Sequence, residues 1–191
     1  NSVLARLVFE PSDQHRFRLT GDYGDRSIST EALSGRSVPP LIGSSVIDLD
    51  GLDENERSRV TLDYTFTNPG GIIDRAFVGI YSQTSWARQF SAEDRNTSAD
   101  RTRDTTFDND VWGVTAQGES AFEGGFANHR LVYGLDYSVS TSGAIRSGTV
   151  PTPPAVFPER PFPETEYTRT GLFIVDEISL LNGALTLFPG I

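Results

Sequence analysis

Residues 59–67, RVTLDYTFT, alternate strictly between polar and apolar side chains and decide the expected fold class. A period of two places successive side chains on opposite faces of a β-sheet, so this segment has one apolar face and one polar face. Residues 131–139, LVYGLDYSV, follow a similar pattern. A strand of about nine to eleven residues with one apolar face is long enough to cross a bilayer when it is tilted.

Short turns and long polar loops alternate along the rest of the chain. We expect strands at 2–10, 15–28, 57–67, 73–90, 105–122, 129–142 and 167–181, and from 184 onward. Short turns fall near 11–14, 68–72, 124–128 and 182–183, and the last is an Asn-Gly hairpin signal. Long loops fall near 29–56, 91–104 and 143–166, and the third is rich in proline, which cannot donate to a β ladder.

The facing of residues 73–90 stays open, because both alternating sets of side chains contain apolar members. The two sets are Ala76, Val78 and Ile80 on one face, and Phe77, Gly79 and Tyr81 on the other.

All the expected long loops fall at one end of the sheet. Bacterial outer-membrane barrels have short periplasmic turns and long extracellular loops, whereas a soluble sandwich has no reason to keep its long loops together. We therefore predict an all-β fold for residues 1–191, an antiparallel meander of about eight strands that forms part of a transmembrane β-barrel. No convincing helical period or βαβ alternation is present, so an α/β fold is not expected. The alternative is a soluble β-sandwich that acts as a binding or adhesion module.

The composition restricts the function further. A net charge of -10 argues against nucleic-acid binding through a basic face. The pairs Arg57/Arg59 and Arg101/Arg103 are interpreted as solvated loop charges, because acidic residues surround both. The chain has no Cys, which excludes disulfides and thiol catalysis. Because it begins at Asn1 and contains no Met, we expect it to be part of a longer protein.

Three aspartates, Asp48, Asp50 and Asp53, are the candidate metal ligands. They supply hard oxygen ligands close together in the expected loop 29–56, and Gly51 between them permits a turn, so a calcium-binding loop is one hypothesis. Their spacing departs from the EF-hand pattern, and the alternative is a solvated acidic loop. A weaker candidate of the same kind consists of Asp104, Asp108 and Asp110.

The strands carry two sets of side chains that we expect in different environments. An aromatic set is predicted to contribute to the girdles at the membrane interfaces: Tyr23, Tyr64, Phe66, Trp86, Trp112, Tyr133 and Tyr137. A polar set is predicted to line a wet lumen: Thr61, Asp63, Glu119 and Asp136. For the aromatic set the alternative is a soluble hydrophobic core. No serine–histidine–acid set, phosphate loop or paired-carboxylate cleft stands out, so we do not expect an enzyme.

Three segments resemble a known family. They are HRLVYGLDY at 129–137, GLFIVDEI at 171–178 and LTLFPGI at 185–191. Together they resemble the barrel of TonB-dependent outer-membrane receptors, and they are similar to the haem and haemoglobin receptor branch. The resemblance implies a barrel of about 22 strands around an N-terminal plug, of which this chain would supply about eight. It also implies a bacterial outer-membrane location, contact with lipid, and energy from TonB through parts of the receptor outside this chain.

The resemblance further implies iron acquisition, with haem or haemoglobin as the transported ligand and no chemistry done on it. A ferric siderophore is the alternative ligand within the family. Family members ligate haem through histidines of the plug and of an extracellular loop. His15 and His129 both open strands directly after short turns, which places them at the periplasmic end. They match neither family position, so we expect wall residues, and the residues that contact a bound ligand stay unassigned.

Overall fold

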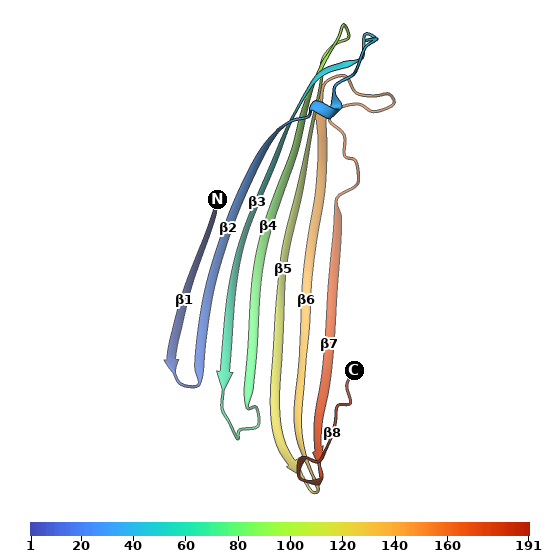
Figure 1. The fold of residues 1–191 in the computed structure, drawn as a ribbon. Coiled ribbons are helices and arrows are strands. Elements are labelled where there is room, and N and C mark those ends of the chain that lie inside the picture. Colours follow the sequence, from blue (N-terminus) through green and yellow to red (C-terminus); the bar gives the residue numbers. More distant parts are fainter.

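The computed structural model describes residues 1–191 as one antiparallel sheet of eight strands, each paired with the next along the chain (Figure 1). The strands are β1 (Ser2–Ser12), β2 (His15–Glu31), β3 (Val46–Thr67), β4 (Arg75–Arg95), β5 (Arg101–Gly124), β6 (Ala127–Gly148), β7 (Thr165–Leu180) and β8 (Leu185–Leu187). Two short 3-10 helices, η1 (Leu33–Gly35) and η2 (Leu181–Gly183), lie in the connections. The predicted all-β meander of about eight strands is confirmed.

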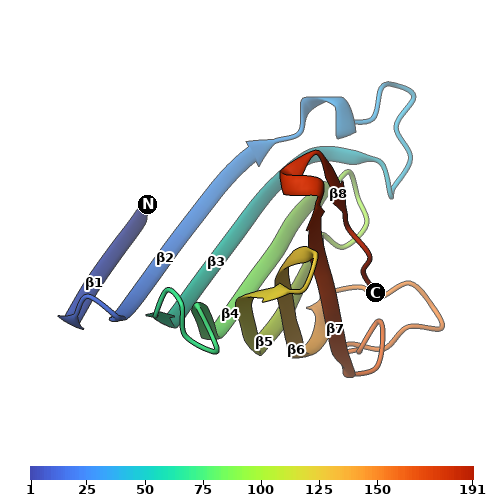
Figure 2. The same cartoon turned by 90° about the horizontal axis from the view of Figure 1, so that it is seen from below.

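The sheet curves like part of a cylinder wall, with β1 at one edge and β8 at the other (Figure 2). It has no core of its own, because only six of 191 residues are buried. A β-sandwich requires a second sheet packed on the first, so the alternative of a soluble sandwich is wrong. Backbone pairing holds the sheet instead, since 110 of the 131 backbone hydrogen bonds lie within regular secondary structure. Neither helix has the length and apolar character of a membrane-spanning helix.

The connections between strands fall into two groups at opposite ends of the sheet (Figure 1). One end has 32–45, 96–100 and 149–164, and the other has 13–14, 68–74, 125–126 and 181–184. Two of the three connections at the first end are long, which makes this end extracellular by the rule for outer-membrane barrels. The prediction of a third long loop is wrong, because 96–100 is shorter than the turn at 68–74.

The strands run further at the extracellular end than the sequence indicates. The expected loops 29–56, 91–104 and 143–166 are wrong in their bounds, and the actual connections there are 32–45, 96–100 and 149–164. β3 and β4 pair from Val46 opposite Arg95 down to Thr67 opposite Arg75. Above the membrane both faces of a strand are wet. The hydrophobic alternation therefore disappears from the sequence while the backbone pairing continues.

The pairing register separates the two faces of the sheet, because directly opposed residues lie on the same face. Leu62 of β3 lies between Leu19 and Ile80. Its neighbour Asp63 lies on the other face, opposite Arg18. The face of Leu62 is an apolar belt that contacts lipid, and we call it the outer face. The face of Asp63 is polar and lines the lumen, and we call it the inner face.

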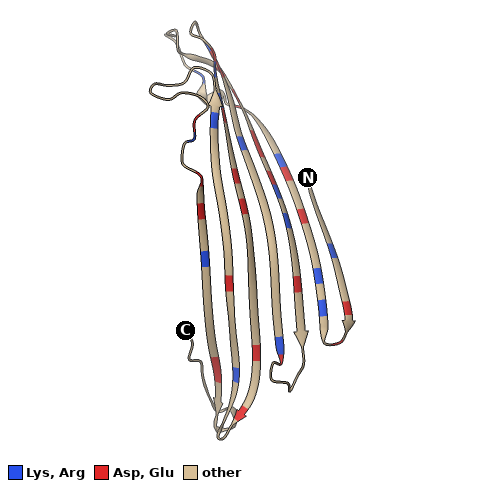
Figure 3. Cartoon of the chain, turned by 180° about the vertical axis from the view of Figure 1, so that it is seen from behind, with Lys and Arg blue, Asp and Glu red and all other residues tan.

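The register also places the two predicted sets of side chains. All seven aromatic residues lie on the outer face: Tyr23, Tyr64, Phe66, Trp86, Trp112, Tyr133 and Tyr137. All four polar residues lie on the inner face: Thr61, Asp63, Glu119 and Asp136. In β4 the outer set is Ala76, Val78 and Ile80, which answers the open question about its facing. Charged residues occur at many heights of the sheet (Figure 3). Arg18, Asp63 and Asp136 lie on the inner face, whereas Asp176 of β7 lies on the outer face near the periplasmic end, opposite Leu131.

The apolar belt covers only part of each strand. In β3 it runs from Phe66 to Val60, and the next residue on that face is Ser58, opposite Tyr23 and Thr84. About nine residues of β3 therefore cross the membrane, which is the length that a tilted strand needs. Residues 46–57 continue for about 40 Å at roughly 3.3 Å per residue. The wall thus projects above the outer leaflet, where water reaches both of its faces.

Candidate ligand-binding site

The two histidines lie at the periplasmic end, as predicted, and on the outer face. His15 begins β2, and its Nδ1 lies 2.8 Å from the hydroxyl oxygen of Tyr64. His129 stacks on Phe122 with ring centroids 5.0 Å apart, and its Nδ1 lies 2.8 Å from a carboxylate oxygen of Asp176. Both imidazoles therefore have partners in the wall, and neither points into the lumen.

The three candidate calcium ligands lie in a strand rather than in a loop. Asp48 and Asp50 of β3 project from the outer face, whereas Asp53 projects from the inner face. Arg36 binds Asp48 at 2.6 Å, and this hydrogen bond, with one from the N–H of Leu49, holds the pKa of that carboxyl below its usual range. The structure shows no group of three or more histidine or acidic side chains that could hold a metal ion. The predicted loop is wrong, and calcium binding by these aspartates stays a prediction.

The weaker acidic candidate also belongs to a strand. Asp104, Asp108 and Asp110 lie on the outer face of β5. Asp104 accepts hydrogen bonds from Arg88 at 2.7 and 2.9 Å, and Glu54 accepts another at 3.1 Å. Arg88, Asp104 and Glu54 thus form an ion-pair network on the outer surface, above the apolar belt.

At membrane level the inner face is held by paired polar groups. Arg18 donates to the carboxylate of Asp63 at 2.6 and 2.7 Å, and Asp63 is only 7% exposed. The hydroxyl of Thr115 donates to Asp136 at 2.6 Å on the same face. These pairs satisfy polar groups that face the interior of a closed barrel, so this part of the wall is structural.

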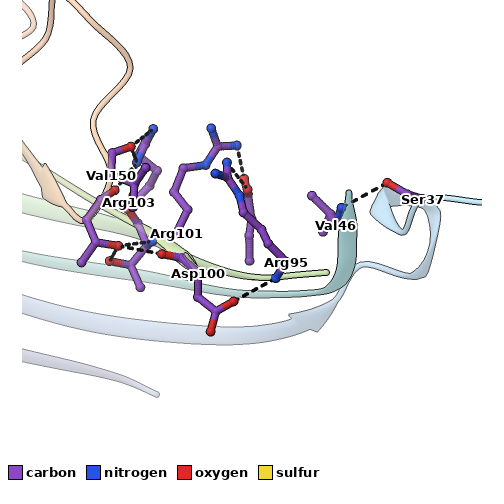
Figure 4. Close-up of polar contacts among 10 residues, drawn as sticks. Ser37, Val46, Arg95, Asp100, Arg101, Arg103 and Val150 are labelled. Carbon is purple, nitrogen blue, oxygen red and sulfur yellow. Dashed lines mark hydrogen bonds and ion pairs between the residues drawn. The ribbon is translucent and has the colours of Figure 1, made fainter. Parts of the chain in front are cut away.

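Four arginines gather on the inner face of the projecting wall, and we call them the mouth cluster. Arg95 ends β4, Arg101 and Arg103 lie at the start of β5, and Arg146 lies in β6. The antiparallel register brings them together. Arg101 of β5 opposes Glu93 of β4, which lies two residues before Arg95, and Arg146 of β6 opposes Thr105 of β5, on the same face as Arg101 and Arg103. Figure 4 shows the side chains of Arg95, Arg101 and Arg103 rising to one side of the strands.

Two carboxylates form ion pairs with three of these arginines. Glu93 accepts from Arg95 at 3.3 Å and from Arg101 at 2.5 Å. Glu159, in the connection between β6 and β7, binds Arg146 at 3.2 Å. The Nε atoms of Arg95 and Arg101 are buried and have no hydrogen-bond acceptor. Donor capacity is therefore left over at the centre of the cluster.

Arg103 has no carboxylate partner. Its guanidinium donates to the carbonyl oxygens of Thr149, at 2.8 Å, and Val150, at 3.4 Å (Figure 4). The same group lies over the ring of Phe157, 5.1 Å from its centroid. Arg103 thus ties the proline-rich connection between β6 and β7 to the inner wall and keeps a full positive charge at the mouth.

The electrostatics of the mouth cluster reflect crowded positive charge. Burial lowers the pKa of Arg103, and the neighbouring Arg101, Arg95 and Arg146 lower it further. Burial alone would raise the pKa of Glu93, but hydrogen bonds and charge from the two arginines outweigh burial and leave that pKa lowered. The carboxylate therefore stays ionised between its two guanidinium partners, and the cluster as a whole keeps an excess of positive charge.

The interpretation of the basic pairs as solvated loop charges is wrong. Arg101 and Arg103 lie in β5, and Arg57 and Arg59 lie in β3, all on the inner face. Arg57 binds Asp22 of β2 at 2.9 Å. The acidic neighbours that suggested loops alternate with the arginines along extended strands.

A curved sheet with a lipid-facing belt, a polar inner face and a projecting extracellular end is a segment of an outer-membrane β-barrel wall. The sequence profile of the family described as TonB dependent receptor-like, beta-barrel matches residues 6–191, and the chain belongs to this family. The chain is thus part of a bacterial outer-membrane receptor. Its family is one of transport receptors rather than enzymes.

One solved structure with the same fold is the crystal structure of the ferric citrate transporter FecA in the unliganded form. The TM-score is 0.62 over 99% of this chain, at 16% sequence identity. The chain spans 28% of the length of that transporter chain. At this identity the likeness shows the fold alone. No curated protein sequence matches the chain.

Proposed function

We propose that the protein containing this chain is an active-transport receptor that imports an iron complex across the bacterial outer membrane. Membership of the TonB-dependent receptor family carries the proposal. In it, a barrel of about 22 strands encloses a plug, and this chain supplies eight neighbouring strands of the wall. TonB supplies energy from the periplasmic side through parts of the receptor outside residues 1–191.

A ferric siderophore is the first candidate ligand. The fold shared with a ferric citrate transporter supports it, and so does the cationic inner surface at the extracellular end. Haem or haemoglobin is the second candidate, supported by the sequence resemblance at 129–137 and 171–178. His15 and His129 add nothing to the haem candidate, because both lie on the outer face at the periplasmic end.

Ligand titration of the intact receptor, purified in detergent, tests the proposal. Ferric citrate binding is followed by quenching of tryptophan fluorescence, haemin binding by Soret absorbance, and haemoglobin binding by pull-down. Saturable, near-stoichiometric binding of one of them supports iron import and identifies the ligand class. Binding of none, together with unchanged uptake of iron by cells that lack the receptor, contradicts iron import and leaves the barrel and its location unaffected.

A further inference from the structure

Side-chain alternation sorts the charges of the projecting wall between its two faces. Asp94 and Asp104 are neighbours of the mouth cluster in sequence, but they lie on the outer face because they are one residue out of phase with the arginines. On the inner face the four guanidinium groups of the cluster form ion pairs only with Glu93 and Glu159. A chain with a net charge of -10 therefore presents a local excess of positive charge inside its mouth.

The cluster also has hydrogen-bond donors without acceptors. The Nε atoms of Arg95 and Arg101 are buried and unpaired, and the Arg95 side chain is only 12% exposed. Buried donors without an acceptor are rare in folded proteins, because they lose their hydration and gain nothing in return. Arg103 is paired with neutral carbonyl oxygens only. An additional anionic acceptor at this position would satisfy donors that the chain itself leaves unpaired.

The choice of side chain narrows the chemistry of that acceptor. All four basic residues of the mouth cluster are arginines, and none is a lysine. The planar guanidinium presents a fork of donors that matches the two oxygens of a carboxylate, whereas an ammonium group acts as a point charge. A group of four such forks on three adjacent strands suits a ligand that carries more than one carboxylate.

We propose that the mouth cluster binds carboxylate groups of the transported iron complex and so selects anionic ligands. The inference rests on the proposed function and deepens it. Ferric polycarboxylates have this chemistry, and so does haem through its two propionates. A ferric hydroxamate, or haem with both propionates esterified, lacks it.

Four probes separate carboxylate recognition from recognition of iron or of the porphyrin ring. The intact receptor in detergent is titrated with ferric citrate and with a ferric trihydroxamate, and with haemin and its dimethyl ester. We expect the receptor to bind the carboxylate-bearing member of one pair at least tenfold more tightly than the member without carboxylates, with the preference decreasing as salt is added.

Arg103→Gln is the informative variant, because Arg103 has no carboxylate partner that its removal would leave unpaired. We expect it to weaken binding of the carboxylate-bearing probe about tenfold, as the loss of one charge-assisted hydrogen bond predicts. Arg103→Lys, which keeps the charge and loses the fork, is expected to recover only part of the loss. Arg88→Gln is the matched control, because Arg88 lies in the same part of the wall but on the outer face. The affinity of the Arg88→Gln receptor for the same probe should change less than twofold.

The outcomes distinguish the inference from the function on which it rests. Binding of an iron complex that is unchanged in Arg103→Gln, or equally weakened in Arg88→Gln, overturns the inference and leaves iron import standing. A lower unfolding temperature of Arg103→Gln with unchanged affinity also overturns it, because the cluster then pairs with acidic groups elsewhere in the receptor. Binding of no iron complex overturns both proposals. A second variant, Arg101→Gln, repeats the test if Arg103→Gln fails to fold.

Discussion

The assignment of the outer face predicts that an arginine at Leu62 will be costly, whereas one at Ser58 on the same face of β3 will not. Leu62 lies two outer-face positions above Phe66 and two below Ser58, in the middle of the apolar belt. Four residues of strand separate the two sites by about 13 Å, or about 10 Å along the membrane normal at the usual tilt. An arginine at the bilayer midplane of a barrel costs about 2–4 kcal/mol, and one near the interface about 0–1 kcal/mol.

Denaturant unfolding of the intact receptor in phospholipid vesicles measures this difference. We expect Leu62→Arg to lower the free energy of unfolding by about 2–4 kcal/mol and Ser58→Arg by less than about 1 kcal/mol. Leu62→Ala is the control that subtracts the packing lost with the leucine side chain. Equal costs at the two sites, or a larger cost at Ser58, would refute the placement of the belt. A negligible cost at both would refute contact of this face with lipid.

Three further predictions concern the inner wall, a periplasmic turn and the packing of the outer face. All are tested on the intact receptor, the second by amide exchange and the other two by unfolding. Asp63→Ala leaves a guanidinium without its partner and should cost about 1.5–3 kcal/mol, whereas Glu10→Gln breaks an ion pair with both side chains more than half exposed and should cost less than about 1 kcal/mol. The pKa of Asp74 is lowered by hydrogen bonds from two backbone N–H groups, that of Gly70 in the same turn and that of Ala121 in β5. Its stabilisation should therefore be complete above the ordinary aspartate pKa of 3.8 and be lost as pH falls through the lower folded value, and amide exchange in Asp74→Asn should lack this pH dependence. A Cβ at Gly118 would lie 2.5 Å from the ring of a neighbouring tyrosine. Gly118→Ala should thus cost about 1–3 kcal/mol by overpacking, whereas Gly21→Ala, with nothing within 4 Å, should cost nothing.

The part of the fold that the sequence predicts well is the part in contact with lipid. At 59–67 and 131–139 one face must be apolar and the other polar, so the strand period is visible in the residues themselves. The upper half of β3, from Val46 to Arg57, has no such contrast, because water reaches both faces. Nothing in its composition distinguishes it from an acidic loop. Only pairing with β2 and β4 makes it a strand.

The mouth cluster could not be predicted, because its four arginines come from three strands and as many as 51 positions separate Arg95 from Arg146. Their sequence neighbours are acidic, which suggested charges neutralised in solvated loops. In an extended strand, however, adjacent residues point to opposite faces, so neighbouring opposite charges are separated rather than paired. The sequence of β5 does contain a pattern that predicts this separation of charge. Its arginines, Arg101 and Arg103, are at odd positions and so on one face of the strand, whereas its aspartates, Asp104, Asp108 and Asp110, are at even positions and on the other.

The same alternation gives the two faces of the projecting wall opposite charge, negative outside and positive inside. Its outer face carries a series of acidic groups, including Asp108 and Asp110, and the mouth cluster lies inside. An anion near the extracellular surface is therefore repelled by the outside of the wall and attracted to its inside, and low-dielectric walls strengthen such a field within a cleft. Attraction of this kind raises the rate of encounter and weakens with salt. About 40 Å of strand beyond the membrane corresponds to about 30 Å along the membrane normal at the usual tilt. In the proposed function, this height places the inner surface where an incoming ligand first meets the barrel.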